Sequence, residues 1–195
     1  MTGRWDHIDK VLQEVFFVTG NSHKLQEVEA VLGKMRHVDL DLPEIQELEP
    51  RKVVIAKAQA AIQQGYNPVL IEDTSLAIVG WNGLPGPLIK WFLKSLGGEG
   101  VYQLAEARGN CGAEVRTVFG LALGPQSFIY GEGVVNGTVV APRGSGFGWD
   151  SIFQPDSSQK TMGEMTPEEK ASCSMRVLAL HDLRAQLERF YNGKQ

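Results

Sequence analysis

The chain has 195 residues, of which 43% are hydrophobic and 22% are charged, and its formal net charge is −4. This length allows one sizeable domain or two small lobes that share a core, and we treat residues 1–195 as a single domain with the composition of an ordinary globular protein. The acidic balance gives no support for binding to nucleic acid or to an acidic membrane, which would favour a basic face, although local lysines can still attract a small anionic substrate.

Neither a targeting segment nor a membrane span is expected. Residues 1–15 contain several acids and no apolar signal core, and no run approaches the roughly 18 apolar residues of a membrane helix. The two cysteines, Cys111 and Cys173, have no CxxC spacing and no ligand pair nearby. Reduced thiols are typical of intracellular proteins, so we expect a cytoplasmic location.

The chain opens with a predicted strand followed by a predicted helix. Residues 15–19 are mostly β-branched or aromatic and form a short run, which is typical of a buried strand. Leu25, Val28 and Leu32 then recur at the spacing of a helix that packs on a sheet. Gly33 is a suitable stop for this helix.

A second strand and a second helix follow. Residues 37–42 alternate as a strand does, and Pro43 restricts that strand to an edge or an end. Pro50 suits the first turn of a helix. The predicted packing face of this helix consists of small residues, namely Val53, Ala56, Ala60 and Ala61.

The rest of the chain adds a buried strand, a hairpin and a terminal helix. Residues 67–80 predict a buried strand that carries acids at its carboxyl end, and residues 81–93 predict a glycine-proline turn opening into a helix. Residues 115–123 and 127–141 predict two antiparallel strands, followed by a glycine-rich loop over 141–156. A helical stripe closes the chain, formed by Leu180, Leu183, Leu187 and Phe190. This order predicts an α/β fold with a mixed central sheet flanked by helices.

The turn "TGNSHK", residues 19–24, is the first candidate for binding an anion. It is too short for the standard phosphate loop, but a helix start offers free backbone N–H groups and partial positive charge. Asn21 or Ser22 can cap the helix, Gly20 lets a ligand come close, and Lys24 lies one turn in, within reach of a phosphate oxygen. The alternative, favoured by spacing alone, is an ordinary capped helix with an exposed lysine.

Acidic residues supply the second candidate. Glu72 and Asp73 follow an apolar run, and an unpaired buried carboxylate is costly, so these side chains must meet solvent or a cation. Glu44 lies in another acidic segment, and acids from two segments can form an oxygen site for magnesium. For Glu47 and Glu49 in that segment, a solvated acidic loop is the favoured interpretation.

Lysines and aromatic residues complete the candidates. Magnesium carboxylates together with several lysines are what a triphosphate site requires. Lys57 and Lys90 lie in predicted helices that follow or precede the acids, and Lys170 precedes the final helix, although each one alone fits a solvated surface charge. The "FGWD" run, 147–150, offers a stacking surface and a hydrogen-bond acceptor. Aromatic residues that close a core beneath a loop explain this run equally well.

Taken together, these segments resemble the inosine triphosphate pyrophosphatase family, in particular its eukaryotic cytosolic members. The matching segments follow one order between about Phe16 and Arg176, and they read "FVTGN", "DLPEIQ", "VLIEDTSL", "GLPGPLIKWFL", "VVAPRG", "FGWDSIFQPD" and "EEKASCSMR". The resemblance implies a mixed sheet, two lobes with the active cleft between them, and a homodimer. It also implies hydrolysis of non-canonical purine nucleoside triphosphates to the monophosphate and pyrophosphate.

The resemblance implies a role for each matching position. Glu44 and Asp73 fall where the family holds Mg²⁺, with Mn²⁺ as a possible substitute, and Asp73 is the expected activator of the water that attacks the α-phosphorus. The positions that match the family's triphosphate-binding residues are Thr19, Gly20, Asn21 and Lys24. The remaining nucleotide contacts implied are Lys57, Thr74, Lys90, Phe147, Gly148, Trp149, Asp150, Lys170, Met175 and Arg176.

Base selection follows from hydrogen-bond chemistry. Hypoxanthine and xanthine present a 6-keto acceptor beside an N1–H donor, so Arg176 as donor and Asp150 as acceptor would favour them over adenine, with Phe147 stacking on the ring. The family usually has Ser-His-Arg where this chain has Ser174-Met175-Arg176, and methionine hardly hydrogen-bonds. We therefore expect looser discrimination between purines. The alternatives kept open are a pyrophosphatase for other modified nucleotides, such as pyrimidines, and a nucleotide sensor without turnover.

Overall fold

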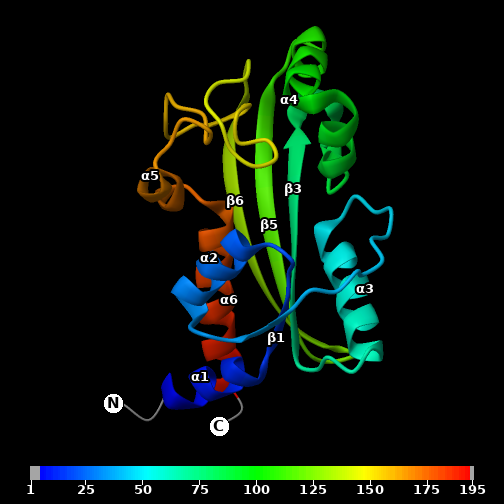
Figure 1. Cartoon of the computed structure of the whole chain (residues 1–195), viewed down its shortest axis with the longest axis vertical. Helices are drawn as coiled ribbons and strands as arrows, with labels where there is room; N and C mark the ends of the chain where they lie inside the picture. Colours follow the sequence, from blue (N-terminus) through cyan, green and yellow to red (C-terminus); the bar gives the residue numbers. More distant parts are fainter. Residues whose placement is uncertain (1–4, 194–195) are drawn as a thin grey trace.

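The structure is a computed structural model that describes residues 5–193 (Figure 1). Its centre is a seven-stranded mixed sheet with strand order β2-β1-β3-β5-β6-β7, and β4 pairs with β3 off this path. β1 pairs in parallel with β2 and β3, whereas β3, β5, β6 and β7 form antiparallel pairs. The strands are β1 Phe16–Val18, β2 Arg36–Val38, β3 Val69–Ile78, β4 Pro85–Gly86, β5 Gly112–Gly124, β6 Ser127–Val139 and β7 Phe153–Pro155. The predicted α/β fold with a mixed sheet is confirmed.

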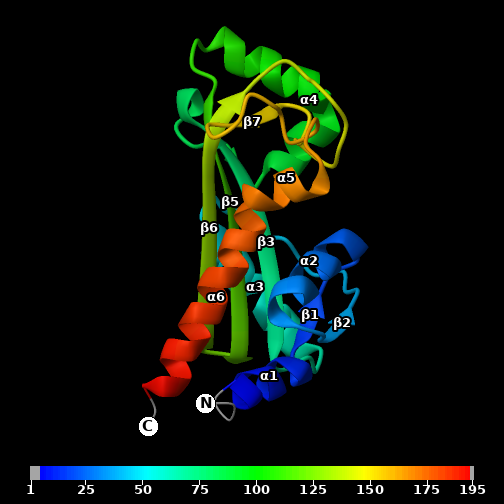
Figure 2. The same ribbon diagram turned by 90° about the vertical axis from the view of Figure 1, so that its left-hand side faces the viewer.

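Helices cover both faces of this sheet, as Figures 1 and 2 show. α3 lies on one face, where Val54 packs so closely on Gly120 of β5 that a Cβ there would come within 2.4 Å of a Val54 methyl carbon. α6 lies on the other face, against Gly131 and Gly133 of β6, where a Cβ would collide with the α6 backbone. The helices are α1 Trp5–Glu14, α2 Ser22–Leu32, α3 Pro50–Gln63, α4 Ile89–Ala107, α5 Pro167–Ser172 and α6 Met175–Asn192, with a short 3₁₀ turn at Val79–Trp81.

The buried apolar residues form three clusters. One joins α1, α2 and α6 to β1, β3 and β5, and a second joins α3 to the opposite face of β3 and β5. The third gathers the far end of β3, α4, the start of β5 and the loops around β7. Since apolar burial is the main stabilising contribution to folding, these clusters hold the helices on the sheet. No helix within residues 5–193 has the length and apolar character needed to cross a membrane.

Several predicted elements are confirmed, and others need correction. The first strand, the helix ending at Gly33, the helix from Pro50, the hairpin and the terminal helix all form. The strand predicted over 37–42 is wrong beyond Val38, because only residues 36–38 pair with β1. α1 and β7 were not predicted.

The predicted packing face of α3 also needs correction. Val53 and Ala61 are buried as expected, but Val54 and Ala58 are buried as well, while Ala56 and Ala60 are only partly buried. The small-residue pattern is nearly uniform around this helix, so spacing alone did not identify the buried side.

β3 has an open stretch on one edge, and this stretch positions the site. β1 pairs with β3 only at Val69 and Leu70, and β4 pairs with it only at Leu76 and Ala77. Between them, residues 71–75 have no described strand beside them on that edge. The acids predicted at the carboxyl end of a strand lie here, in the middle of β3, just after its parallel pairing ends. The strand predicted over 67–80 contains β3, but the acids do not lie at its carboxyl end, because β3 continues for several residues in antiparallel pairing with β5.

Candidate active site

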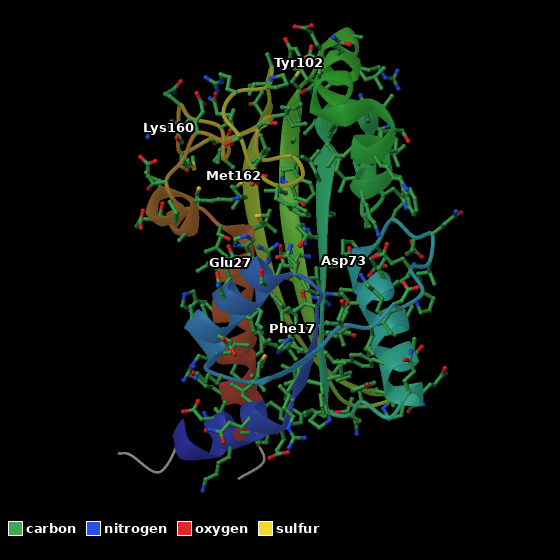
Figure 3. The ribbon with its side chains drawn as sticks, viewed as in Figure 1. Phe17, Glu27, Asp73, Tyr102, Lys160 and Met162 are labelled. Atoms are coloured by element: carbon green, nitrogen blue, oxygen red, sulfur yellow. The ribbon has the colours of Figure 1, made fainter. Side chains whose placement is uncertain are left out.

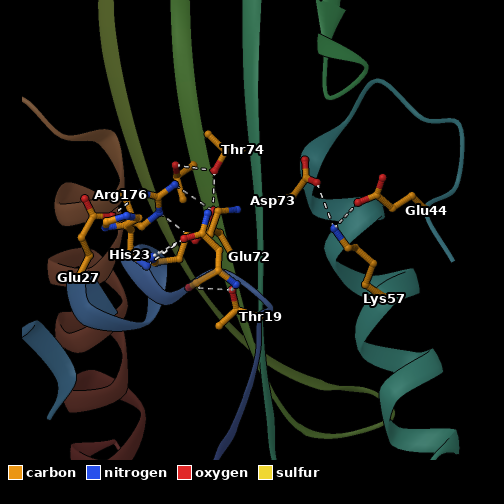
Figure 4. A network of polar contacts seen from close by, with 12 residues as sticks. Thr19, His23, Glu27, Glu44, Lys57, Glu72, Asp73, Thr74 and Arg176 are labelled. Carbon is orange, nitrogen blue, oxygen red and sulfur yellow. Dashed lines mark hydrogen bonds and ion pairs between the residues drawn. The ribbon is translucent and has the colours of Figure 1, made fainter. Parts of the chain in front are cut away.

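The two neighbouring acids of β3 project to opposite faces of the sheet (Figure 4). Successive side chains of a strand alternate between faces. Asp73 pairs with Val118 of β5 on the face covered by α3, whereas Glu72 pairs with Phe119 on the face covered by α2 and α6. Figure 3 places Asp73 and Glu27, a residue of α2, on opposite sides of β3. The candidate site therefore includes two polar groups, one on each face of the sheet, next to the open edge of β3.

The group around Asp73 is a chain of alternating charges. The ammonium Nζ of Lys57 lies 3.1 Å from Oε1 of Glu44 and 3.6 Å from Oδ1 of Asp73. Lys90, at the start of α4, reaches Oε2 of Glu44 at 3.2 Å. The structure thus brings together four residues predicted from the sequence, contributed by a loop, two helices and β3. Lys57 is not the solvated surface charge kept as an alternative, since its side chain is only 15% exposed.

Burial makes Asp73 a weak acid. Its desolvation raises the carboxyl pKa to about 7, against the opposing effect of the Lys57 charge, and the negative charges of Glu44 and Glu72 raise it further. Its Oδ2 atom is buried without a hydrogen-bond partner in the structure. For Glu44, partial burial raises the pKa, but the charges and hydrogen bonds of Lys57 and Lys90 lower it below its ordinary value overall. A carboxyl that titrates near neutral pH, with one free oxygen, can accept a proton from water.

Glu44 and Asp73 fit a divalent cation of the magnesium type. Both supply hard oxygen donors, and the unpartnered Oδ2 of Asp73 is a buried acceptor that a cation would satisfy. Within residues 5–193, no group of three or more His, Cys, Asp and Glu side chains is arranged to hold a metal ion. A pair of carboxylates is nevertheless enough for Mg²⁺, which usually binds through one or two carboxylates plus substrate phosphates and water.

The group on the other face has Glu72 at its centre. This carboxylate is 2% exposed and accepts hydrogen bonds from Lys24 Nζ at 2.9 Å and from Arg176 Nε at 2.9 Å. Thr74 Oγ1 donates to it at 2.8 Å, and Arg176 also pairs with Glu27 of α2. Burial alone would raise the pKa of Glu72, but the charges of Arg176 and Lys24 lower it to about 2. Glu72 is therefore ionised at neutral pH and holds both cations in place.

Sequence reasoning missed two members of this group. Glu72 was noted only as the neighbour of Asp73, and Glu27 was not considered. The alternation of a strand was the available signal for Glu72, since it requires two adjacent acids to face opposite sides. No signal marks Glu27, because its role depends on Arg176, a residue of α6 that is 149 positions away in the sequence.

The start of α2 is capped by its own turn. Asn21 Oδ1 accepts hydrogen bonds from the backbone N–H groups of His23 at 2.9 Å and Lys24 at 3.3 Å, which identifies Asn21 rather than Ser22 as the cap. These two N–H groups are therefore already partnered. Thr19 Oγ1 accepts from the Asn21 N–H at 3.1 Å, so the Thr19 side chain braces the turn.

Gly20 has a structural reason to be glycine that was not predicted. A Cβ at this position would lie 2.7 Å from a carboxylate oxygen of Asp39, which follows β2. The carboxylate of Asp39 thus occupies the side where a Cβ would lie, and the expectation that the Gly20 backbone lets a ligand come close stays a prediction.

A third group of predicted residues lies in the glycine-rich loop and α5. Phe147 is 76% exposed, whereas Trp149 packs against the third apolar cluster. Asp150 is buried, accepts from the Phe147 N–H at 2.9 Å and pairs with Lys170 at 2.5 Å. Each interpretation of "FGWD" therefore holds for one of its aromatic residues. Phe147 offers an exposed ring for stacking, whereas Trp149 closes a core. Gly148, between the two, adopts a positive φ of 65°.

Arg176 and Asp150, the donor and acceptor expected to contact the base, each have partners within the protein. Arg176 is paired with Glu72 and Glu27, and Asp150 with Lys170. Met175 is also not presented to the loop surface, since it is 7% exposed and belongs to the same apolar cluster as Trp149. The carbonyl of Met175 lies against Gly133, where a Cβ would come within 2.0 Å of it, and this close contact fixes the start of α6 on the sheet.

A cavity of about 530 Å³ lies on the Asp73 face of the sheet but is not lined by Asp73. Its lining includes acids and arginines that pair with one another, such as Arg116 with Glu132 at 2.9 Å. The cavity lies beside the Asp73 group, since Val118 lines it and is the β5 partner of Asp73. The lining residues are Glu47, Leu48, Glu49, Pro50, Arg51, Arg116, Val118 and Glu132.

Comparison with known proteins agrees with the resemblance found in the sequence. Residues 15–186 match the Ham1 family. The chain belongs to this family. A protein of Schizosaccharomyces pombe named inosine triphosphate pyrophosphatase is 48% identical over 183 residues, which cover 91% of this chain and 97% of that protein.

Solved structures agree with this assignment. A HAM1 protein from Coxiella burnetii superposes with a TM-score of 0.74 at 27% identity, covering 92% of this chain and 98% of that one. A Mycobacterium abscessus protein described as a nucleoside-triphosphatase / dITP/XTP pyrophosphatase superposes with a TM-score of 0.67 at 28% identity, covering 87% of this chain and 97% of that one. This Ham1 family member therefore shares its fold with both solved proteins over nearly their whole length.

Proposed function

We propose that this Ham1 family protein hydrolyses non-canonical purine nucleoside triphosphates, such as those of inosine, deoxyinosine and xanthosine, to the monophosphate and pyrophosphate. The observation that carries the proposal is Asp73, a buried carboxyl with a pKa of about 7 and an unpartnered oxygen, held beside Glu44 and Lys57. The names of the relatives support the substrate class. The proposal treats residues 1–195 as one domain that acts in the cytoplasm as a homodimer, with the active cleft between two lobes.

Glu44 and Asp73 would hold the divalent cation, Mg²⁺ or in its place Mn²⁺. When bound, that cation supplies charge neutralisation at the phosphate oxygens. Lys57 and Lys90 lie next to these carboxylates, so their ammonium groups are positioned to bind phosphate oxygens of the same substrate. On the other side of the open edge, Lys24 adds a cation and Thr19 and Asn21 shape the turn. Electrostatic stabilisation of this kind is often the largest contribution to catalysis.

Asp73 acts as the general base in this mechanism. Its carboxylate takes a proton from a water molecule while the water oxygen forms a bond to the α-phosphorus. The bond between the α-phosphorus and the bridging oxygen breaks, and the electron pair leaves with pyrophosphate. A base is most effective when its pKa lies close to the working pH, and burial raises the pKa of Asp73 to about 7 before a cation binds.

The base would bind near the glycine-rich loop. The exposed ring of Phe147 is available for stacking, and Lys170 and Asp150 form a polar pair behind it. Arg176 and Thr74 contact the same Glu72 carboxylate as Lys24, which is one of the proposed phosphate contacts. A site built to hydrogen-bond a 6-keto purine rejects adenine because mismatched polar groups would be left buried and unpaired.

The decisive experiment is product analysis with inosine triphosphate, with and without Mg²⁺, beside adenosine and guanosine triphosphates. Magnesium-dependent release of inosine monophosphate and pyrophosphate, with the standard purines spared, is the expected result. Release of orthophosphate and a diphosphate would mean attack at the γ-phosphorus and would contradict the mechanism. Absence of turnover with all three would contradict the proposed function and favour modified pyrimidines or a sensor.

A further inference from the structure

Lys57 occupies the position between the two carboxylates that are expected to hold a metal. Its ammonium lies 3.1 Å from Glu44 Oε1 and 3.6 Å from Asp73 Oδ1, and Lys90 lies 3.2 Å from the other oxygen of Glu44. Figure 4 shows the first two contacts as a bridge between β3 and the loop before α3. Two carboxyl groups thus meet two ammonium groups, and the negative charge that would attract a dication is offset within the protein itself.

This balance opposes the binding of a free dication. Lys57 lies against Oε1 of Glu44 and Oδ1 of Asp73, so a metal bound to Glu44 and to the unpartnered Oδ2 of Asp73 would lie only a few ångströms from its ammonium. Like charges at that separation in a partly buried site repel strongly. The Lys57 side chain and the Asp73 side chain are 15% and 11% exposed, so water screens this repulsion poorly. A metal ion would therefore bind more tightly once Lys57 has moved away.

A nucleotide phosphate would offer the Lys57 ammonium an alternative anionic partner. The ammonium of lysine is a compact charge with three donors on a flexible four-carbon stem. A triphosphate at the open edge of β3 would bring anionic oxygens close to it, and the ammonium could exchange its carboxylate partners for a phosphate oxygen. The carboxylates of Glu44 and Asp73 would then be free for the metal that accompanies the nucleotide.

We propose that the Lys57 ammonium weakens metal binding to Glu44 and Asp73 in the free protein. It moves away from these carboxyl groups when a nucleotide phosphate binds. This inference rests on the proposed function for the identity of the two ligands. It makes metal and nucleotide bind with positive coupling, which by linkage is reciprocal: each strengthens the binding of the other. The charged site is therefore completed by the substrate itself.

The test is Mn²⁺ binding to the metal-free protein without nucleotide, with free Mn²⁺ counted by electron paramagnetic resonance. Lys57→Met removes the ammonium and keeps an unbranched apolar side chain. We expect the wild-type protein to bind Mn²⁺ weakly and the variant to bind it at least about tenfold more tightly, a typical size for such coupling. The gain should disappear in the double variant Lys57→Met with Asp73→Asn, because one carboxylate ligand is lost.

Lys52→Met is the matched control. Lys52 lies on the same helix and pairs with Glu47 at 3.2 Å and Glu49 at 3.4 Å, so the change in net charge is the same but the contacts of Asp73 are untouched. Its Mn²⁺ affinity should stay at the wild-type value. Lys57→Gln provides a second substitution should Lys57→Met fail to fold, with circular dichroism and thermal melting as the check on each variant.

Two outcomes would overturn the proposal. Mn²⁺ affinity unchanged in the folded Lys57 variants would mean that the ammonium does not compete with the metal. An equal gain in Lys52→Met would mean that net charge alone is responsible. Hydrolysis of inosine triphosphate by the wild-type protein is measured separately, so a protein without turnover would contradict the proposed function while the competition for Mn²⁺ could still be observed.

Discussion

Glu72 and Asp73 are neighbours on β3, yet their surroundings shift the pKa values of their carboxyl groups in opposite directions. Glu72 lies between Lys24 and Arg176, and its pKa is lowered to about 2 against the effect of burial. Asp73 is buried with one oxygen unpartnered, and its pKa is raised to about 7. One peptide bond thus joins a permanent anion, which holds two cations in place, to a group that can gain and lose a proton near neutral pH.

The raised pKa of Asp73 predicts how stability depends on pH. In the unfolded chain this carboxyl titrates near 3.8 and in the folded protein near 7, so the folded state loses stability as pH rises between these values. Asp73→Asn removes this pH-dependent loss of stability, because asparagine does not titrate. We expect the free energy of unfolding of the variant, relative to wild type, to increase by at most about 4 kcal/mol between pH 4 and pH 8, since each pKa unit corresponds to about 1.4 kcal/mol.

Urea unfolding in the presence of a chelator measures this difference. Asp156→Asn, at an exposed position, is the control and should follow the wild-type curve at each pH. A constant difference between Asp73→Asn and wild type across the range would show that Asp73 does not titrate between the two values.

Glu72→Gln should show the opposite pH dependence. Its folded pKa of about 2 lies below the ordinary 4.5, so the charged form contributes stability above about pH 4.5 that is lost as pH falls toward 2. At neutral pH the variant leaves Lys24 and Arg176 without their shared carboxylate, and we expect it to be less stable by about 3 kcal/mol. Urea unfolding at pH 7 and pH 3 provides the comparison. Equal losses at both values would exclude an electrostatic cause.

Asp73→Asn should also abolish turnover while the fold is kept. Removal of a general base lowers kcat by about 10²- to 10⁴-fold. Steady-state kinetics with inosine triphosphate and Mg²⁺ measure the loss, and circular dichroism checks the fold. A variant with substantial activity would remove Asp73 from the proposed mechanism.

Phe147→Ala should weaken nucleotide binding without affecting the fold. The ring is 76% exposed, so the free energy of unfolding should change by less than about 0.5 kcal/mol. Loss of a stacking surface for a base is worth about 1–3 kcal/mol, so KM for inosine triphosphate should rise roughly tenfold or more. Leu104→Ala, another exposed large apolar residue, is the control for nonspecific effects. If KM were unchanged, Phe147 would not contact the base.

Met175→His tests the departure from the family sequence. Because Met175 is buried in an apolar cluster, a histidine there should lower the free energy of unfolding by about 1–3 kcal/mol. We also expect the variant to discriminate more sharply between inosine and guanosine triphosphates, measured as the ratio of their kcat/KM values. Met175→Leu should leave both the stability and the ratio near wild type. An unchanged ratio in Met175→His would count against looser base preference in the natural chain.

Local patterns in the sequence were enough for most of the secondary structure. The helices from Ser22 and Pro50, the hairpin of β5 and β6, and the buried stripe of α6 follow from periodicity and from glycine and proline positions. The sequence did not predict α1 or the position of the acids in the middle of β3. α1 buries Ile8 and Leu12 against α6, and the last part of β3 pairs with β5, so both depend on partners far away along the chain.

The sequence by itself determined which residue types were available for the chemistry: adjacent acids, spaced lysines and an aromatic glycine-rich loop. Only the tertiary structure decided their partners. It assigned Glu72 to Lys24 and Arg176, and it assigned Asp73 to Lys57, because alternation along β3 sends the two acids to faces covered by different helices. Charge, burial and pKa are properties of such three-dimensional neighbourhoods, and sequence spacing carries no information about them until the helices are packed.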